Sequence, residues 1–151
     1  MNTETIIIGT DHAGYQLKED IKTFLIDKGM TVVDVGAPSG DSVDYPDYGA
    51  LAARRISSGE INRGILICGS GIGMSIVANK FPRVRAALCL DEDMARLSRL
   101  HNDSNILVLA GRKTDASTAR KIVDIWLVTE FEGGRHQKRI DKIKDLEHKQ
   151  F

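Results

Sequence analysis

The sequence predicts a single three-layer α/β/α domain, over residues 1–151, that is built on a five-stranded parallel sheet. Its 151 residues are a length typical of one domain. Short runs rich in Ile, Val and Leu alternate with amphipathic segments along the whole chain. The apolar runs show almost no polar alternation, which is typical of strands buried on both faces of a parallel sheet.

The five predicted strands are residues 5–9, 31–35, 63–68, 84–90 and 105–110. A helix-like segment follows each of them, so right-handed crossovers should place helices on both faces of the sheet. This is a Rossmann-like arrangement.

The first three helices are predicted from apolar faces and from residues that begin or end helices. The first helix has an apolar face made by Leu17, Ile21, Phe24 and Leu25. Gly29 should end it, and Pro46 favours the first turn of a second helix. A third helix should begin near Gly71 and stop before Pro82, because the residue preceding a proline resists the helical conformation.

The last three helices are predicted in the same way. Asp91 and Asp115 are suited to cap the fourth and fifth helices. The expected inner stripe of the fourth is Met94, Leu97 and His101, and that of the fifth is Ala119, Ile122, Val123 and Trp126. After two glycines at 133–134, a last helix carries Ile140, Ile143 and Leu146 and should form a C-terminal arm.

Composition excludes several functional classes. Lys plus Arg and Asp plus Glu both number 21, so the basic excess of a general nucleic-acid binder is missing. The apolar runs are too short to cross a bilayer, and we expect no signal peptide. Cys68 and Cys89 lack metal or redox spacing, so we interpret them as reduced thiols of a cytoplasmic protein, with Cys89 in the core.

Polar and glycine residues gather where the predicted strands end. They lie at residues 9–14, 44–48, 68–73 and 111–112, and His101-Asn102-Asp103 directly precedes the fifth strand. In open parallel sheets the ligand site lies at the carboxyl ends of the strands. We therefore expect these residues to form one site.

The glycine loop Cys68-Gly69-Ser70-Gly71-Ile72-Gly73 is typical of an anion site beside a nucleophile or base. Glycines let the backbone approach a ligand, and the start of a helix offers free N–H groups and a positive dipole end. The same end favours a thiolate at Cys68. A dinucleotide fingerprint is disfavoured because Met74 occupies the third glycine position. The alternative is an inert core cysteine beside glycines that only pack helix on strand.

Four histidines require separate interpretation. His12 follows Asp11 at a strand end, which favours a functional role. His101 is either a functional residue near a helix C-terminus or a half-buried structural histidine. His136 and His148 lie in the charged tail and are expected at the surface. No histidine, cysteine and aspartate group has metal-site spacing, so we expect neither metal nor cofactor.

Arg135 and Arg139 lie four residues apart, on one face of the last helix. Two guanidinium groups on one face can clamp a phosphate by bidentate hydrogen bonds. The alternative is a solvated basic helix start. Because basic residues oppose the dipole at a helix start, a bound anion would account for them better.

Taken together, these motifs resemble those of the type B ribose-5-phosphate isomerases and the related galactose-6-phosphate and allose-6-phosphate isomerases. The motifs are Asp11-His12-Ala13-Gly14, Asp44-Tyr45-Pro46, the run from Cys68 to Ile76 with Ala78-Asn79-Lys80, His101-Asn102-Asp103, and Gly133-Gly134-Arg135-His136. The resemblance covers nearly the whole chain, with the motifs in the family's order and at similar spacing.

The resemblance implies a proton-transfer mechanism without a metal. His101, helped by Asp11, would open the sugar ring, and Cys68 would be the base. The hydroxyl of Ser70, where many members have threonine, would move a proton between the two sugar oxygens. The substrate-binding residues would be His12, Tyr45, Gly69, Gly71, Ile72, Gly73, Asn102, Arg112, Arg135 and Arg139. Some arginines would come from a second subunit, which implies a homodimer with shared sites and leaves a tetramer open.

Two alternatives remain open. One is an isomerase of galactose 6-phosphate or allose 6-phosphate, since the loop at 41–48 belongs to the pocket that measures substrate length. The other is a phosphosugar- or nucleotide-binding module that has lost catalysis. The intact Cys68, Ser70 and His101 argue against that second alternative.

Overall fold

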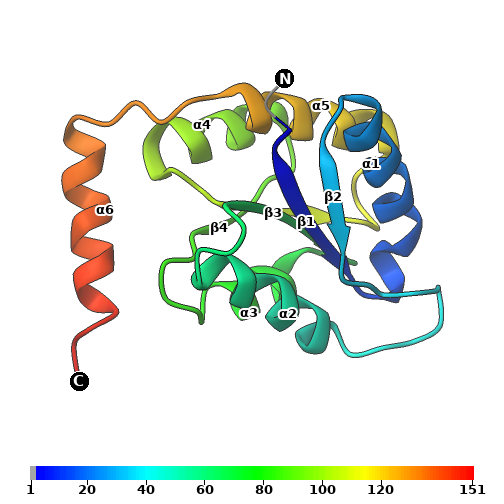
Figure 1. Cartoon of the computed structure of the whole chain (residues 1–151), viewed down its shortest axis with the longest axis horizontal. Coiled ribbons are helices and arrows are strands. Elements are labelled where there is room, and N and C mark those ends of the chain that lie inside the picture. Colours follow the sequence, from blue (N-terminus) through cyan, green and yellow to red (C-terminus); the bar gives the residue numbers. More distant parts are fainter. Residues whose placement is uncertain (1–2) are drawn as a thin grey trace.

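The computed structural model describes residues 3–151, and its strands form one parallel sheet (Figure 1). The strands are β1 (Thr5–Thr10), β2 (Thr31–Asp34), β3 (Arg63–Cys68), β4 (Ala86–Leu88) and β5 (Ile106–Ala110), in the order β2-β1-β3-β5-β4. Every neighbouring pair is parallel. The predicted five-stranded α/β sheet is confirmed, and only residues 1–2 of the predicted domain lie outside the described range.

Helices cover both faces of the sheet. A short 3-10 turn, η1 (His12–Gly14), leads into the first helix. On one face lie α1 (Tyr15–Asp27), α4 (Glu92–Asn102) and α5 (Ala116–Val128), and on the other lie α2 (Tyr45–Ser57) and α3 (Ile72–Ala78) (Figure 1). The last helix, α6 (Arg135–Leu146), stands beside these layers as the predicted arm.

The core is divided in two by the sheet. Successive residues of a strand point to opposite faces, so Ile65 and Ile67 contact the α1, α4 and α5 side. Leu66 and Cys68 contact the α2 and α3 side. The apolar runs lack alternation because both faces are covered. The end of β3 therefore places the Cys68 thiol at the start of the loop that leads into α3.

The predicted capping residues take up their roles. The Asp91 carboxylate accepts a hydrogen bond from the backbone N–H of Met94, and the Asp115 carboxylate accepts one from Thr118. Each satisfies an N–H group that a helix start leaves unpaired. Gly29 follows α1 with a φ of 85°, in the left-handed region that favours glycine.

The expected inner stripe of α4 was wrong for Met94 and Leu97, whereas its third residue, His101, is half-buried. Met94 and Leu97 are 42% and 36% exposed, whereas Ala95 and Ser98 are buried. The Ser98 hydroxyl donates to the Ala95 carbonyl oxygen. Small side chains face the protein interior because they permit close packing, so the large apolar side chains of α4 are left at the surface.

Strand β4 is shorter than the predicted run at 84–90. The backbone N–H groups of Arg85 and Ala86 donate to the side-chain oxygens of Asn105 and Asn79, respectively. Side-chain amides thus satisfy two backbone N–H groups at the start of this edge strand. Among residues 3–151, no helix has both the length and the apolar character needed to span a membrane.

Candidate active site

A cavity of about 620 Å³ lies at the carboxyl edge of the sheet. It is lined by Asp11, His12, Ala13, Tyr45, Cys68, Gly69, Ser70, Ile72, Gly73, Ile76, Arg112 and Lys113. These residues lie at or after the ends of β1, β3 and β5, at the start of α2, or in α3. Most of the residues predicted from the strand ends therefore do meet in one place.

Backbone hydrogen bonds join the loops after β3 and β5. The N–H of Gly111 donates to the Cys68 carbonyl oxygen at 2.8 Å, and that of Arg112 donates to the Gly69 carbonyl oxygen at 3.0 Å. A Cβ atom on Gly69 would lie 3.3 Å from Cδ of Arg112. The absence of a side chain at Gly69 thus lets Arg112 approach the glycine loop at residues 68–73.

Cys68 is the last residue of β3 and is 4% exposed. The chain then turns sharply at Gly71, whose φ of 77° lies in the left-handed region. The Ser70 hydroxyl oxygen accepts a hydrogen bond from the backbone N–H of Ile72 at 3.2 Å. Since that oxygen acts as an acceptor, its own proton remains free to be donated to a ligand.

Tyr45 lies over Gly73. A Cβ atom on Gly73 would lie 2.6 Å from Cζ of Tyr45, so a larger residue there would displace the ring. Tyr45 begins α2 and Gly73 is in the first turn of α3. This contact connects the start of α2 to the glycine loop at residues 68–73.

Asp11 and His12 occupy the end of β1. The Asp11 carboxylate is 7% exposed and accepts a hydrogen bond from Gly14 N–H at 3.1 Å, which caps η1. Nδ1 of the His12 ring accepts a hydrogen bond from the backbone N–H of Val43 at 3.1 Å. The Asp11 side chain is therefore held by the turn that directly follows it, and the His12 side chain by the backbone of the loop between β2 and α2.

Five predicted site residues do not line this cavity. Gly71 lies in the loop between the lining residues Ser70 and Ile72 but is not itself part of the lining, and the other four are His101, Asn102, Arg135 and Arg139. The two arginines are exposed on α6, and His101 is half-buried at the end of α4. Within one chain, the predicted site is divided into two groups.

His136 was expected at the surface, and this was wrong. It is 4% exposed, and its ring stacks on the ring of His101 with 4.3 Å between centroids and 17° between planes. Its Nε2 has no hydrogen-bond partner within residues 3–151 and lies 3.7 Å from Oε1 of Glu132. Burial, followed by the charge of His101, lowers the pKa of His136. His136 precedes the buried Ile140 by four residues, so helical periodicity would have placed it inward.

The same pair belongs to a cluster that sequence spacing did not reveal. Ligand atoms of His101, Glu132 and His136 all lie within 4.8 Å of one another. The lone pairs of an imidazole lie in its ring plane. Because the two rings are stacked nearly parallel, their lone pairs do not converge on a common point. We therefore interpret the cluster as a histidine pair rather than as a metal centre.

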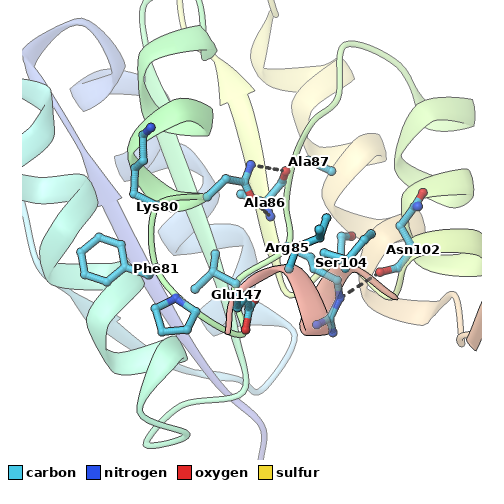
Figure 2. A pocket seen from close by; sticks show the side chains of 13 residues that line it. Lys80, Phe81, Arg85, Ala86, Ala87, Asn102, Ser104 and Glu147 are labelled. Carbon is cyan, nitrogen blue, oxygen red and sulfur yellow. Dashed lines mark hydrogen bonds between the residues drawn. The ribbon is translucent and has the colours of Figure 1, made fainter. Parts of the chain in front are cut away.

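A second cavity, of about 730 Å³, lies between α6 and the β4 edge of the sheet (Figure 2). Apolar side chains from both sides line it: Phe81, Pro82, Val84, Ile143 and Leu146. Asn102 lies at this cavity, and its carbonyl oxygen accepts a hydrogen bond from Nε of Arg85 at 3.0 Å (Figure 2).

Ala13, Ile76 and Lys113 also line the first cavity. Ala13 belongs to the strand-end run at 9–14 that was expected there, whereas Ile76 and Lys113 were not predicted to line it. Both of the latter left a signal in the sequence. Lys113 follows Arg112 at the same strand end, and Ile76 lies one helical turn after Ile72.

Comparison with known proteins places the chain in a family. A family model described as Ribose/Galactose Isomerase matches residues 6–143. The chain is 44% identical over 144 residues to Ribose-5-phosphate isomerase B of Escherichia coli (strain K12), covering 95% of this chain and 97% of that relative. It is 41% identical over 147 residues to the D-erythrulose-4-phosphate isomerase of Pectobacterium atrosepticum, covering 97% of each chain.

Solved structures agree with these sequence matches. The structure of Ribose-5-phosphate Isomerase B from Mycoplasma genitalium with bound ribulose-5-phosphate aligns with a TM-score of 0.95 at 42% identity, covering 99% of this chain and all of that one. That of Clostridium thermocellum Ribose-5-Phosphate Isomerase B gives 0.94 at 51% identity, covering 95% and 97% of the two chains. The agreement of sequence and fold over nearly the full length shows that this chain is an isomerase and belongs to the ribose/galactose isomerase family.

Proposed function

We propose that this isomerase interconverts ribose 5-phosphate and ribulose 5-phosphate, with Cys68 as the base that moves the proton. One observation carries the proposal: a single cavity unites the Cys68 thiol, the Ser70 hydroxyl and the cationic Arg112. These are a base, a proton carrier and an anion-binding group. Relatives named as ribose-5-phosphate isomerase B support the choice of substrate.

The proton moves in two steps. The Cys68 thiolate removes the proton from C2 of the open aldose, and the C1 carbonyl oxygen takes up the negative charge as an enediolate. The Ser70 hydroxyl moves a proton from O2 to O1. The Cys68 thiol then returns its proton to C1, which leaves the carbonyl group at C2. Backbone N–H groups of residues 69–73 stabilise the enediolate charge.

Ring opening and phosphate binding need groups from both halves of the divided site. His12 and Arg112 hold the phosphate within the cavity, together with Arg135 and Arg139 of a second copy. His101 of that copy acts with Asp11 on the ring oxygen and the anomeric hydroxyl. Asn102 of the same copy adds a hydrogen bond to the enediolate.

A homodimer with shared sites therefore forms part of the proposal. Large apolar side chains are exposed on α3, which lines the cavity, and on α4, as expected where a subunit interface forms. Ile72 and Ile76 of α3 are 57% and 58% exposed, and Met94 and Leu97 of α4 are also exposed. A second copy packed on these helices would bury the apolar side chains and complete the cavity.

A hexose 6-phosphate is the second candidate substrate. The matching family model covers galactose as well as ribose isomerases, and one close relative is named for a four-carbon ketose phosphate. The chemistry at Cys68 would be unchanged. The loop at 41–48 and Tyr45 would decide how many carbons fit between the phosphate site and the base.

The test is an isomerisation assay of the purified chain in excess EDTA. Ribose 5-phosphate, allose 6-phosphate and galactose 6-phosphate are offered in parallel. We expect ribulose 5-phosphate to form fastest. Turnover of only a hexose phosphate would change the assigned substrate to a hexose 6-phosphate and leave the proposed mechanism unchanged. Tight phosphosugar binding without any turnover would contradict the proposal and support a binding module.

A further inference from the structure

The loop between β2 and α2 reaches the predicted phosphate residue His12 through a single backbone hydrogen bond. The N–H of Val43 lies 3.1 Å from Nδ1 of His12. A backbone amide can only donate, so Nδ1 must present its lone pair. In the neutral ring the proton is then on Nε2. The tautomer can be assigned because the partner is a backbone N–H, which only donates. A rotatable hydroxyl could either donate or accept and would leave the tautomer open.

We propose that Val43 is a positioning residue, whose backbone N–H holds His12 as the Nε2–H tautomer and so fixes it as a hydrogen-bond donor to the substrate phosphate. The role of the phosphate rests on the proposed function. The tautomer follows from the hydrogen bond alone.

In the proposed phosphate site, the positive charge and the oriented hydrogen-bond donor then come from two different residues. His12 and Arg112 line the same cavity. The guanidinium group of Arg112 supplies a permanent positive charge. A neutral Nε2–H adds a directed donor without adding a charge. An imidazole of the opposite tautomer would present a lone pair from Nε2 and repel the phosphate oxygens.

The loop is fixed well enough to hold the ring. Nζ of Lys18, which is 2% exposed, donates to the Ala37 carbonyl oxygen at 2.8 Å and to Oδ1 of Asp34 at 3.1 Å. The same Asp34 oxygen accepts a hydrogen bond from Gly36 N–H at 2.9 Å. At the other end the loop continues directly into α2. Between these anchors, the backbone at Val43 is positioned against His12.

The loop therefore contributes twice to the cavity. It leads directly into Tyr45 of α2, which lies over Gly73, and it sets the tautomer of His12. A change of loop conformation would alter both the space available to the sugar and the donor available to the phosphate.

The direct test is a long-range ¹H–¹⁵N NMR spectrum of the full-length protein at mildly alkaline pH, where a free imidazole is neutral. The His12 signals are assigned from a His12→Gln variant, in which they disappear. We expect the pattern of a proton fixed on Nε2. A proton on Nδ1, or exchange between both tautomers, would overturn the proposal whether or not the protein turns over ribose 5-phosphate.

A matched pair of variants tests the source of the tautomer. Val43→Pro removes the N–H, whereas Val43→Ala keeps it and changes only the side chain. For Val43→Pro we expect tautomer exchange at His12 and a KM for ribose 5-phosphate raised about tenfold, with kcat changed much less. Val43→Ala should retain the wild-type tautomer and KM. Unchanged His12 signals in Val43→Pro would overturn the role of Val43.

Substitution of His12 itself gives a result that does not depend on the folding of the Val43→Pro loop. The amide nitrogen of glutamine reaches the position of Nε2, whereas that of asparagine reaches only the position of Nδ1. We expect His12→Gln to have a lower KM than His12→Asn. The opposite order would contradict an Nε2–H donor.

Discussion

At the scale of single residues, the two cysteines have different surroundings. Cys89 is 1% exposed in the core beside α4, and its Sγ lies 3.6 Å from the Ala87 carbonyl oxygen. Burial raises the pKa of Cys89 to about 11, so its thiol stays protonated. Cys68 is also buried but lines a cavity next to Ser70. Cys89 therefore serves as a built-in control for the chemistry proposed at Cys68.

The stacked histidines at the end of α4 give a prediction about stability and pH. The pKa of His136 is lowered from 6.5, chiefly by burial and then by His101. The unfolded state therefore binds a proton at higher pH than the folded state does. The contribution of His136 to the free energy of unfolding should therefore be complete above the ordinary pKa of histidine. It should fall as the pH drops through that value.

Urea unfolding of wild type and His136→Gln between about pH 5 and pH 8 measures this effect. We expect the variant to lose less stability on acidification than wild type does. His148→Gln, at an exposed position, should keep the wild-type slope. Parallel slopes for wild type and His136→Gln would show that His136 does not carry the pH dependence.

At the scale of the elements, a buried lysine holds the connection between β2 and α2. Replacing Lys18 with methionine leaves the Ala37 carbonyl oxygen and Asp34 without their buried donor. We expect the free energy of unfolding to fall by about 1–3 kcal/mol. Lys22→Met is the matched control, because Lys22 pairs with the same Asp34 but is 34% exposed.

The control should cost less than about 1 kcal/mol, as is usual for exposed ion pairs. Chemical denaturation of both variants gives the comparison. An equal loss for the two lysines would contradict the anchoring role of Lys18.

The helices also show which predictions the sequence supports. Strands buried on both faces and capped helices were predicted correctly, because apolar runs and capping aspartates act locally. The inner face of α4 was not, since Ala95 and Ser98 give a weak hydrophobic signal although they are buried. Likewise, the pairing of His101 with His136 joins residues 35 positions apart in the sequence. Only the tertiary structure brings them together.

At the scale of the whole molecule, one chain holds two incomplete groups of predicted site residues. The strand-end group surrounds Cys68, and the other group lies on α4 and α6 with His101. Sequence reasoning could group residues at the ends of parallel strands, because topology brings those ends to one edge. It could not place the α4 and α6 residues from topology alone, since α6 lies outside the layers (Figure 1).

Subunit complementation tests whether a second copy completes the site. Cys68→Ala and His101→Ala chains are each expected to be inactive as homodimers. In a mixed dimer, one of the two sites combines an intact Cys68 with an intact His101. Random pairing should therefore restore about a quarter of wild-type activity.

The two differently tagged chains are co-expressed, and the isomerisation rate is compared with that of each chain alone. A mixture as inactive as its components, despite confirmed mixed dimers, would mean that each site is built within one chain.

The central claim is that Cys68 transfers the proton, and solvent exchange tests it most directly. Wild type, Cys68→Ala and Cys89→Ala are incubated with ribose 5-phosphate in D₂O, and deuterium at the sugar carbons is followed by NMR. We expect incorporation with wild type and with Cys89→Ala. Cys68→Ala should bind the sugar phosphate but incorporate no deuterium and form no ketose. Near-normal deuterium incorporation by Cys68→Ala would contradict the assignment of Cys68 as the base.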